Sequence, residues 1–512
     1  MKEMILIAVG GSGARVAQSV GALAAAGFAD RLAREEARLT IRLVDIDINH
    51  EDGMELRKLV ESYHEAFQFL WDARCKKERQ GWRPLEIVLE APGLFYFGTG
   101  FDGGVYNYPS IESYINGFIN LNTASMPLVE ALYGTVDLKM QLYDGCKGHP
   151  HVGALLWEHL YEKSFTPFWD TLTGRAGSPD PARIMFAGSL FGGTGASGVP
   201  TLAKCMRESL APKQNWDIGL TLMAPYFYLN DAMEREVLPG EVEVDFSQFS
   251  FQSKLALNYY ILEDVLPKVE CIQVVGSDKQ SMVDRNGAAV ENKGDSTEHP
   301  QNDPAVPTEL AAAIGIMQYF TEVWNRSVFV PKETIEEKHD WSMFPQADIV
   351  RGCLQQLERF CLMTRDYFTT LALLKNTSLA PTFIKEFWSE STRSEDNWKS
   401  IWKGKGQGIG ALLEFSENML NWFLEMDRNG LTVLSVDKYA TILERKAKRG
   451  QTSGVKLHGV RGSAILGVMN QQVPRYFESR EHNETPNNPV SDAYALALMD
   501  ACETPYTRRR AK

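Results

Sequence analysis

The sequence has neither a long apolar run nor paired cysteines. Nowhere do about twenty consecutive apolar residues occur without glycine or charge, as a bilayer-spanning helix would need. The seven cysteines are scattered, with no CxxC pair and no histidine at metal-ligand spacing, so they predict neither a disulfide framework nor a zinc site. The first residues follow a strand pattern, Met4 to Val9, instead of a secretory signal. We therefore expect a cytoplasmic protein with no membrane insertion.

Positive charge is also in short supply. The 53 Lys and Arg residues oppose 66 Asp and Glu residues, which gives a formal net charge of -13. An acidic protein repels nucleic acid and anionic lipid at long range, so nucleic acid is not an expected partner. The basic run Arg508 to Arg510 with Lys512 is interpreted as a solvated end. With 512 residues, 44% of them hydrophobic, the composition is that of a folded chain of more than one domain.

Strands that end in glycine and lead into helices determine the predicted fold. An unbroken apolar run from Ile5 to Val9 enters Gly10, and the small apolar residues of Val16 to Ala26 follow as a buried helix. The next apolar run, Thr40 to Val44, ends in acidic side chains and completes a βαβ unit. Repetition of this unit predicts an α/β fold with a doubly wound parallel sheet. The alternation continues at Arg183 to Gly188, Pro200 to Leu210, Ile218 to Met223, Leu255 to Val265, Cys271 to Val275 and Thr308 to Trp324.

The pattern changes near residue 330, where we predict a domain boundary. Residues 1–330 form the α/β domain, with a mostly helical, aromatic-rich insertion at about 51–140 whose aromatic side chains are expected in a core. Asp278 to Pro307 is polar and rich in turn-forming residues, so we expect a loop there. Residues 331–512 have helical spacing, apart from a β-like Leu431 to Val436, and predict a helix-rich C-terminal domain.

The first glycine segment, Gly10-Gly11-Ser12-Gly13, is a candidate anion site. Glycines let the main chain approach a ligand closely, and the following helix directs its N-terminal amides at an anion. A glycine turn after a first strand also occurs in dinucleotide-binding folds, where an acidic residue such as Asp45 contacts the ribose. An NAD- or FAD-binding Rossmann-type enzyme is therefore one interpretation of this half of the sequence.

A second glycine segment favours a different ligand. Residues 187–198 read AGSLFGGTGASG and add a second amide-lined concavity, with hydroxyls that bond phosphate oxygens. A single diphosphate needs one such turn, whereas a triphosphate held between two helix N-termini uses both. Gly192 to Gly198 resembles the GGTGxG signature of tubulin and of the bacterial division protein FtsZ, and the match extends from Ala187 through Lys204.

Other pieces of the sequence resemble the same family, in family order. Gly145 to Pro150 with Gly153 to Leu156 is similar to the tubulin segment that contacts the terminal phosphate. Met223 to Tyr228 resembles the strand and turn that FtsZ places near the ribose. Together with Gly10 to Gly13 these pieces cover roughly the first 330 residues, and the chain resembles the divergent bacterial tubulin-like proteins more than tubulin itself.

The resemblance implies a GTP- or GDP-binding domain that forms homo-oligomers or filaments, or switches partners, according to nucleotide state. Asp45 and Asp47 would hold Mg²⁺ through water, as suits hard carboxylate oxygens. Lys147 and His149 lie where the terminal phosphate would be sensed, with solvated loop positions as the alternative. Asn302, with Asp303, is the candidate for bonding the guanine edge. The nucleotide-binding residues so implied are Gly10, Gly11, Ser12, Gly13, Asp45, Gly148, Gly192, Gly193, Thr194, Gly195, Ser197 and Asn302.

The sequence departs from tubulin and FtsZ where hydrolysis would be completed. No GxxNxD-like segment follows Thr308 to Trp324, and Leu229 and Met233 stand at the spacing of FtsZ's glutamate and arginine. Any GTPase activity is therefore expected to be weak, and its catalytic residues are unassigned. A protein partner at the C-terminal helices and a role in bacterial stress or defence are further expectations from the resemblance. The remaining alternatives are a nucleotide-free scaffold and, for the aspartates and Asn302, simple turn or helix-start roles.

Overall fold

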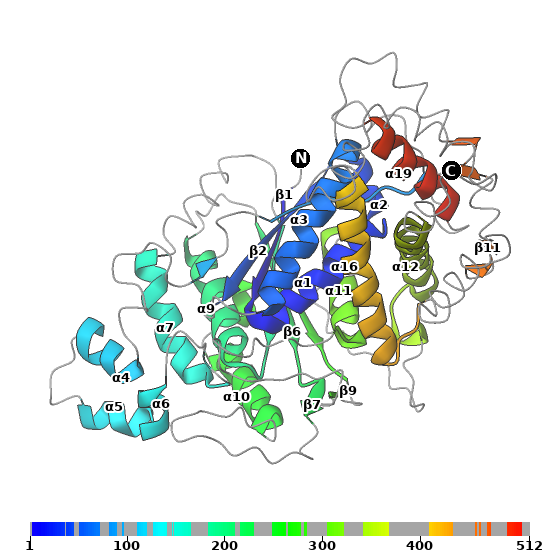
Figure 1. Cartoon of the computed structure of the whole chain (residues 1–512). Helices are drawn as coiled ribbons and strands as arrows, with labels where there is room; N and C mark the ends of the chain where they lie inside the picture. Colours follow the sequence, from blue (N-terminus) through cyan, green and yellow to red (C-terminus); the bar gives the residue numbers. More distant parts are fainter. Residues whose placement is uncertain are drawn as a thin grey trace, which may run out of the picture. The chain divides into compact units, whose positions relative to one another are not determined.

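The central sheet has seven strands (Figure 1). The computed structural model describes residues 3–35, 37–45, 51–71, 81–89, 95–96, 110–119, 126–140, 146, 148–164, 183–209, 216–229, 248–262, 265–277, 281–283, 305–321, 341–367, 409–433, 456–457, 460–461, 468–469, 471–472 and 489–503. The sheet runs in the order β3-β2-β1-β5-β6-β8, with β4 also paired to β2. All pairings among β1, β2, β4, β5, β6 and β8 are parallel, which confirms the predicted fold class. The strands are β1 Glu3–Val9, β2 Arg38–Asp45, β3 Glu86–Leu89, β4 Phe95–Tyr96, β5 Arg183–Ser189, β6 Asp217–Met223 and β8 Cys271–Val275.

Two compact units share the chain. The sheet unit comprises Met1–Val20, Ala37–Arg57 and Val88–Glu333, and the helical unit comprises Gly21–Glu36, Lys58–Ile87 and Thr334–Lys512. Residues 21–36 and 58–87 thus belong to the same unit as the C-terminal residues. The predicted boundary at residue 330 divides the chain once and does not include this exchange. The α-helices are α1 Gly10–Ala25, α2 Asp30–Arg34, α3 Glu51–Trp71, α4 Ile111–Tyr114, α5 Met126–Leu132, α6 Thr135–Lys139, α7 Pro150–Ser164, α9 Gly193–Ser209, α10 Phe249–Leu262, α11 Pro307–Thr321, α12 Ala347–Leu362, α16 Ile409–Arg428 and α19 Pro489–Cys502. The remaining short elements are η2 Ile115–Ile119, η6 Leu266–Lys268, η7 Trp341–Met343, η8 Met363–Tyr367 and the strands β7 Phe227–Leu229, β9 Ser281–Val283, β10 Lys456–Leu457 and β11 Val460–Arg461.

Helices cover both faces of the sheet because successive side chains of a strand point to opposite faces. On one face, Ile5, Ile7 and Val9 of β1 belong to a buried cluster with residues of α7 and α9. On the other face, Gln273 of β8 accepts a hydrogen bond from Thr221 of β6 (3.1 Å) and donates one to the Gly315 carbonyl of α11 (2.9 Å). The helix α11 is buried from Pro307 to Phe320, which explains why its sequence is apolar on almost every side.

The chain changes its direction across the sheet between β1 and β5. From β1 it proceeds to β2 on one side, whereas β5, on the other side, leads to β6 and β8. In open parallel sheets, ligands bind outside the carboxyl ends of the strands at such a switch point, where the diverging connections leave a crevice. Both glycine segments lie there, because Gly10 directly follows β1 and Gly192 comes three residues after the last residue of β5.

The glycine segments are the first turns of helices. Helix α1 begins at Gly10 and α9 at Gly193, six and seven residues before the starts predicted at Val16 and Pro200. Glycine lowers helix propensity, so the apolar pattern places these starts too late. The first turn of α9 is held by hydrogen bonds to the carbonyls of Gly192 and Gly193, from Ala196 N (3.3 Å) and Ser197 Oγ (2.6 Å) respectively.

Aromatic side chains form the core of the helical unit. The ring of Phe415 in α16 lies 5.6 Å from that of Tyr63 and 5.2 Å from that of Phe67, both in α3. Phe360 of α12 lies 5.7 Å from Phe67 and 5.6 Å from Trp82. The expectation that the aromatic residues of this stretch belong to a core is confirmed for Tyr63, Phe67 and Trp82.

The described residues of the insertion are mostly helical, as predicted, and they add two short strands, β3 and β4, beside β2. Two other local expectations are wrong. Residues 431–433 form no strand: Gly430 ends α16 with φ at 90°, and Leu431 N donates to the Met426 carbonyl (2.9 Å), so these apolar residues close the helix end. The predicted loop Asp278 to Pro307 contains β9, which pairs with β7.

Two expectations drawn from composition can be compared with the described residues. The six cysteines among them form no disulfide bond. Within the ranges given above, no helix has the length and apolar character needed to cross a bilayer.

Candidate functional site

The two glycine segments contact each other. Gly10 has a φ of 71°, a backbone conformation that favours glycine. A β-carbon placed on Gly10 would lie 3.3 Å from the Thr194 Cβ and 3.4 Å from the Gly195 N. Residues 184 positions apart in the sequence, Gly10 and Thr194, are therefore neighbours at the carboxyl edge of β1 and β5. The N-termini of α1 and α9 form one site.

Several of these glycines are needed for packing within the fold. A β-carbon on Gly13 would lie 2.6 Å from the Ala187 carbonyl oxygen, and one on Gly195 would lie 2.7 Å from Ser189 N. The residues that remain half-buried are Gly11, Ser12, Gly192 and Thr194. These four residues are the part of the two segments that a ligand can reach, although the Gly192 amide already donates to Ser189 Oγ.

Ser197 lies behind this surface. Its side chain is buried, and its hydroxyl donates to the carbonyl of Gly193 (2.6 Å) within α9. Ser189 at the end of β5 accepts a hydrogen bond from Gly192 N (3.1 Å). Both serine hydroxyls thus shape the turn between β5 and α9. The expectation that Ser197 contacts nucleotide stays a prediction.

A third segment closes the site. A β-carbon on Gly193 would lie 2.8 Å from the Cys146 carbonyl carbon, and the Thr194 side chain hydrogen-bonds the Cys146 thiol. Burial, together with the negative charge of Asp45, raises the pKa of that thiol well above its ordinary value, so it stays protonated and is no nucleophile. The structure therefore brings Asp45, at the end of β2, and the segment that holds Gly148 to the glycine site.

The segment after Cys146 turns sharply into α7. Gly148 has a φ of 79°, and His149 N donates to the Cys146 carbonyl (2.7 Å). The side chain of His149 pairs with Asp137, Nδ1 to Oδ1 at 2.7 Å. Burial lowers the pKa of His149, while Asp137 acts in the opposite sense. Its predicted role at a terminal phosphate would require this pair to open.

Three predicted site residues lie outside the described residues: Asp47, Lys147 and Asn302. Of the proposed Mg²⁺ ligands, Asp45 alone is described, and its side chain is 4% exposed. The part of the site that the structure brings together is therefore the phosphate part, namely the starts of α1 and α9, Asp45 and the turn at Gly148.

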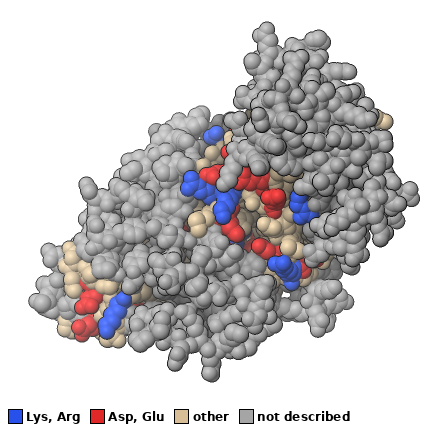
Figure 2. Space-filling model, in the orientation of Figure 1, with Lys and Arg blue, Asp and Glu red and all other residues tan. Residues whose placement is uncertain are grey.

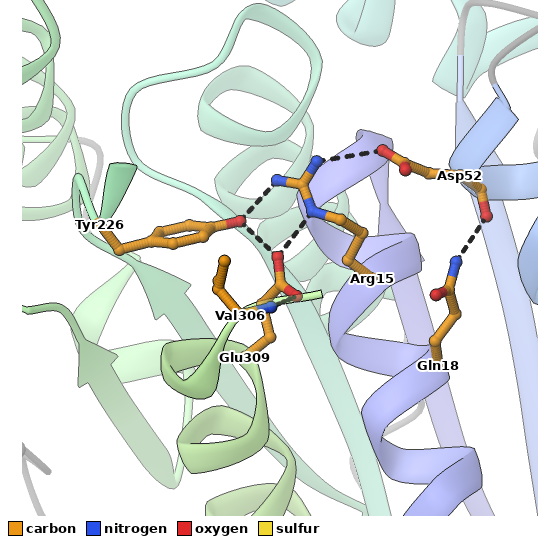
Figure 3. Close-up of polar contacts among 6 residues, drawn as sticks. All are labelled: Arg15, Gln18, Asp52, Tyr226, Val306 and Glu309. Atoms are coloured by element: carbon orange, nitrogen blue, oxygen red, sulfur yellow. Dashed lines mark hydrogen bonds and ion pairs between the residues drawn. The ribbon is translucent and has the colours of Figure 1, made fainter. Parts of the chain in front are cut away.

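A buried network of charged side chains lies further along α1 (Figure 3). Arg15 Nε donates to Glu309 Oε1 (2.6 Å), Nη1 to Asp52 Oδ2 (3.1 Å) and Nη2 to the Tyr226 hydroxyl (2.6 Å). The Tyr226 hydroxyl in turn donates to Glu309 Oε1 (2.8 Å). The exposed fractions of the Arg15 and Glu309 side chains are 4% and 0%. One guanidinium thus joins α1, α3, α11 and the turn after β6.

Glu309 also closes the first turn of α11. Its Oε2 accepts a hydrogen bond from Val306 N (3.1 Å), while its own backbone N donates to the Val306 carbonyl (3.1 Å). This is the glutamate half of a capping box, and Pro307 fits the first helical position because that position needs no amide donor. Burial raises the pKa of Glu309, and Arg15 and the hydrogen bonds oppose that rise. The network therefore fixes where α11 begins.

The sequence pattern alone did not identify this network. Arg15 and Glu309 are each part of an otherwise apolar helix start, and buried charges of opposite sign in two such helices have to pair. That signal was available in the sequence. The resemblance predicts Tyr226 in a turn near the ribose, and in the structure its hydroxyl lies between Arg15 and Glu309.

Comparisons with solved structures give a distant likeness. No protein-family model matches the sequence, and no curated protein matches it. Among solved structures, CetZ2 from Haloferax volcanii in a GTPγS-bound protofilament, a protein of the tubulin and FtsZ family, is 15% identical over 54% of this chain and 50% of that chain, with a TM-score of 0.25. The chain thus spans about half the length of CetZ2. The assignment of the fold as a parallel α/β sheet with helices on both faces rests on the strand order and pairing described above.

Proposed function

We propose that this chain binds a guanine nucleotide, GTP or GDP with Mg²⁺, at the switch point between β1 and β5. The observation that carries the proposal is the contact between two glycine-rich helix starts at the carboxyl ends of neighbouring parallel strands. The start of a helix directs backbone amides and the positive end of the helix dipole outward, and both favour phosphate. Two such helix starts side by side suit a chain of phosphates better than a single anion.

The charge of the protein makes a metal necessary for tight binding. The net charge is -13, and on the face drawn in Figure 2 the described acidic and basic side chains lie interspersed, with no field of one sign. Phosphate binding therefore depends on local amides and on a cation that offsets the phosphate charge. Asp45 is the described carboxylate at this edge of the sheet and is proposed to hold Mg²⁺ through water, together with Asp47.

The choice of guanine rests on the resemblance of Gly192 to Gly198 to the tubulin and FtsZ signature. An NAD- or FAD-binding enzyme would use the start of α1 with Asp45 as ribose ligand, and it leaves the second helix start without a role. A nucleotide-free scaffold would need no half-buried Thr194 or Ser12 at the junction. Nucleotide-dependent self-assembly or partner switching is the proposed consequence of binding, with at most weak GTP hydrolysis.

The nucleotide content of the purified protein tests the proposal most directly. We expect GDP or GTP to be released on denaturation, and calorimetry to give micromolar or tighter GTP binding that strengthens with Mg²⁺. A released dinucleotide, or binding of NAD in preference to GTP, would contradict the proposal in favour of the Rossmann-type alternative. Light scattering after GTP addition then tests self-assembly.

Thr194→Val is expected to weaken GTP binding about tenfold, because it keeps the side-chain shape but removes the hydroxyl, which bonds the Cys146 thiol here and is proposed to turn to a phosphate oxygen when nucleotide binds. Thr201→Val is the matched control, since Thr201 is also half-buried on α9 and its hydroxyl also bonds within the protein, to the Ser197 carbonyl (2.8 Å), but it lies about two turns from the helix start. Calorimetry of both variants measures the difference. Equal affinities would contradict the assignment of Thr194 to the phosphate site.

Asp45→Asn is expected to reduce the effect of Mg²⁺ on GTP affinity at least tenfold, since the amide keeps the shape but loses the charge that the cation needs. Affinity measured in EDTA should change little or rise, because a negative charge near the phosphates is gone. A variant that keeps the full Mg²⁺ effect would remove Asp45 from the metal site.

A further inference from the structure

Two histidines and one carboxylate converge at the start of α7. His149 precedes the helix, His151 lies in its first turn, and Asp137 lies in the short helix α6. The His149 Nδ1 is 2.7 Å from Asp137 Oδ1, and the His151 Nε2 is 2.8 Å from Asp137 Oδ2. The Tyr133 ring stacks on the His151 imidazole with centroids 5.8 Å apart. Each oxygen of the Asp137 carboxylate is thus within hydrogen-bond distance of a different imidazole.

These three side chains have the composition of a transition-metal site. One ligand atom from each lies within 4.8 Å of the others. The exposed fractions are 28% for His149, 46% for His151 and 13% for Asp137, so the cluster is held by the fold yet open to water on one side. Two imidazole nitrogens and one carboxylate oxygen suit zinc and neighbouring divalent metals, whereas Mg²⁺ and Ca²⁺ prefer oxygen ligands alone.

We propose that Asp137, His149 and His151 bind one divalent transition-metal ion, with Zn²⁺ as the reference ligand. Three protein ligands leave one or two coordination positions to water or a small anion. The nucleotide-site Mg²⁺ is a separate ion with a different ligand set. The proposal stands on this cluster alone and is independent of nucleotide binding.

A simple hydrogen-bonded cluster is the competing explanation, and geometry separates the two. The present nitrogen-to-oxygen distances of 2.7 and 2.8 Å are those of hydrogen bonds. Tetrahedral ligands around Zn²⁺ stand about 3.3 Å apart, given bonds of about 2 Å. An ion therefore enters by replacing the two bridging protons and widening each contact by about 0.5 Å, which small side-chain rotations supply.

The cluster is joined to the candidate phosphate site through the backbone. His149 N donates to the Cys146 carbonyl, and Cys146 lies against Gly193 at the start of α9. A metal held by His149 would fix the turn at Gly148. This connection gives the ion a structural role beside the site without making it a ligand of the nucleotide.

Titration with ZnCl₂, and with CoCl₂ as a spectroscopic probe, tests the proposal on the tag-free full-length protein. We expect one ion per chain with micromolar or tighter affinity. Bound Co²⁺ should show visible d–d bands and no thiolate-to-cobalt charge transfer in the near ultraviolet. A strong thiolate band would place the ion on cysteine and overturn the proposal.

Asp137→Asn and His151→Ala are each expected to weaken Zn²⁺ binding at least tenfold, and His64→Ala, a histidine on α3 outside the cluster, should leave it unchanged. Asp137→Asn keeps the side-chain shape and one hydrogen-bond acceptor, so loss of metal binding with an unchanged circular dichroism spectrum separates ligand loss from misfolding. Retention of wild-type Zn²⁺ affinity by both cluster variants would overturn the proposal. So would stoichiometric binding that His64→Ala abolishes.

Discussion

Replacing Arg15 with methionine is expected to lower the free energy of opening of the α1 and α11 region by about 3–5 kcal/mol. Methionine keeps the aliphatic stem but removes the guanidinium that Glu309, Asp52 and Tyr226 share. Two buried carboxylates are then left without this cation. Breaking a buried ion pair from one side costs more than the pair contributes, because the remaining charge has lost its compensation.

The effect of Arg15→Met should depend on pH. Burial already raises the pKa of Glu309 in the wild-type protein, and loss of Arg15 removes the largest opposing interaction, so the pKa rises further. A carboxyl whose pKa is raised by folding binds more protons in the folded state than in the unfolded chain, whose pKa is about 4.3. The contribution of such a carboxyl to stability is therefore most favourable at pH values below the pKa of the unfolded chain, and it declines as pH rises. The deficit of Arg15→Met should be smallest near pH 4 and grow toward pH 7.

Hydrogen exchange followed by mass spectrometry on peptides from residues 10–20 and 307–321 measures this change locally. A local measurement is needed because the chain forms two compact units, for which a single unfolding free energy is poorly defined. The double variant Arg15→Met/Glu309→Met should recover part of the loss, since it removes both charges of the closest pair. Arg31→Met is the matched control: Arg31 pairs with Glu35 at 76% and 48% exposure, and its loss should cost no more than about 0.5 kcal/mol. If Arg31→Met lost as much free energy as Arg15→Met, burial would not explain the cost of removing Arg15.

The strands and the glycine segments could be predicted because each is a local pattern. A strand buried on both faces is a continuous apolar run, as Ile5 to Val9 shows, and the glycine that follows it marks the helix start. The helix starts at Gly10 and Gly193 were placed too late for the same local reason, since glycine is a poor helix former and the surrounding fold overrides that preference. The contact between Gly10 and Thr194 follows once both strands are known to be neighbours.

The side-chain clusters could not be predicted in this way. Arg15 and Glu309 are 294 residues apart, and nothing in the spacing of either helix says which partner it meets. The Asp137 cluster depends on how α6 approaches α7, two helices linked by a segment with no apolar period. In both cases single polar residues acquire their chemistry from tertiary packing. The sequence pattern shows such a residue only as an interruption and does not identify its partner.

Gly13→Ala is expected to destabilise the sheet unit by about 2–3 kcal/mol and to abolish GTP binding. The added methyl group would lie 2.6 Å from the Ala187 carbonyl oxygen, 2.9 Å from the Ala8 carbonyl carbon and 3.2 Å from the Ala8 Cα. All three are backbone atoms of the neighbouring strands β1 and β5, so no side chain can rotate away. Either α1 or both strands must shift, and the shift falls at the proposed phosphate site.

Gly21→Ala on the same helix provides the control for this prediction. A β-carbon on Gly21 would meet Leu59 Cδ2 at 3.4 Å, an ordinary contact with the end of a flexible side chain. Because alanine favours helix more than glycine by up to about 1 kcal/mol, this variant should be as stable as wild type or slightly more so, with normal GTP affinity. Thermal unfolding, hydrogen exchange of residues 10–20 and GTP titration compare the two. If both variants bind GTP and unfold alike, close backbone packing at Gly13 does not define the site. If Gly13→Ala alone loses stability and GTP binding, both the fold and the nucleotide site depend on the close packing of this helix start.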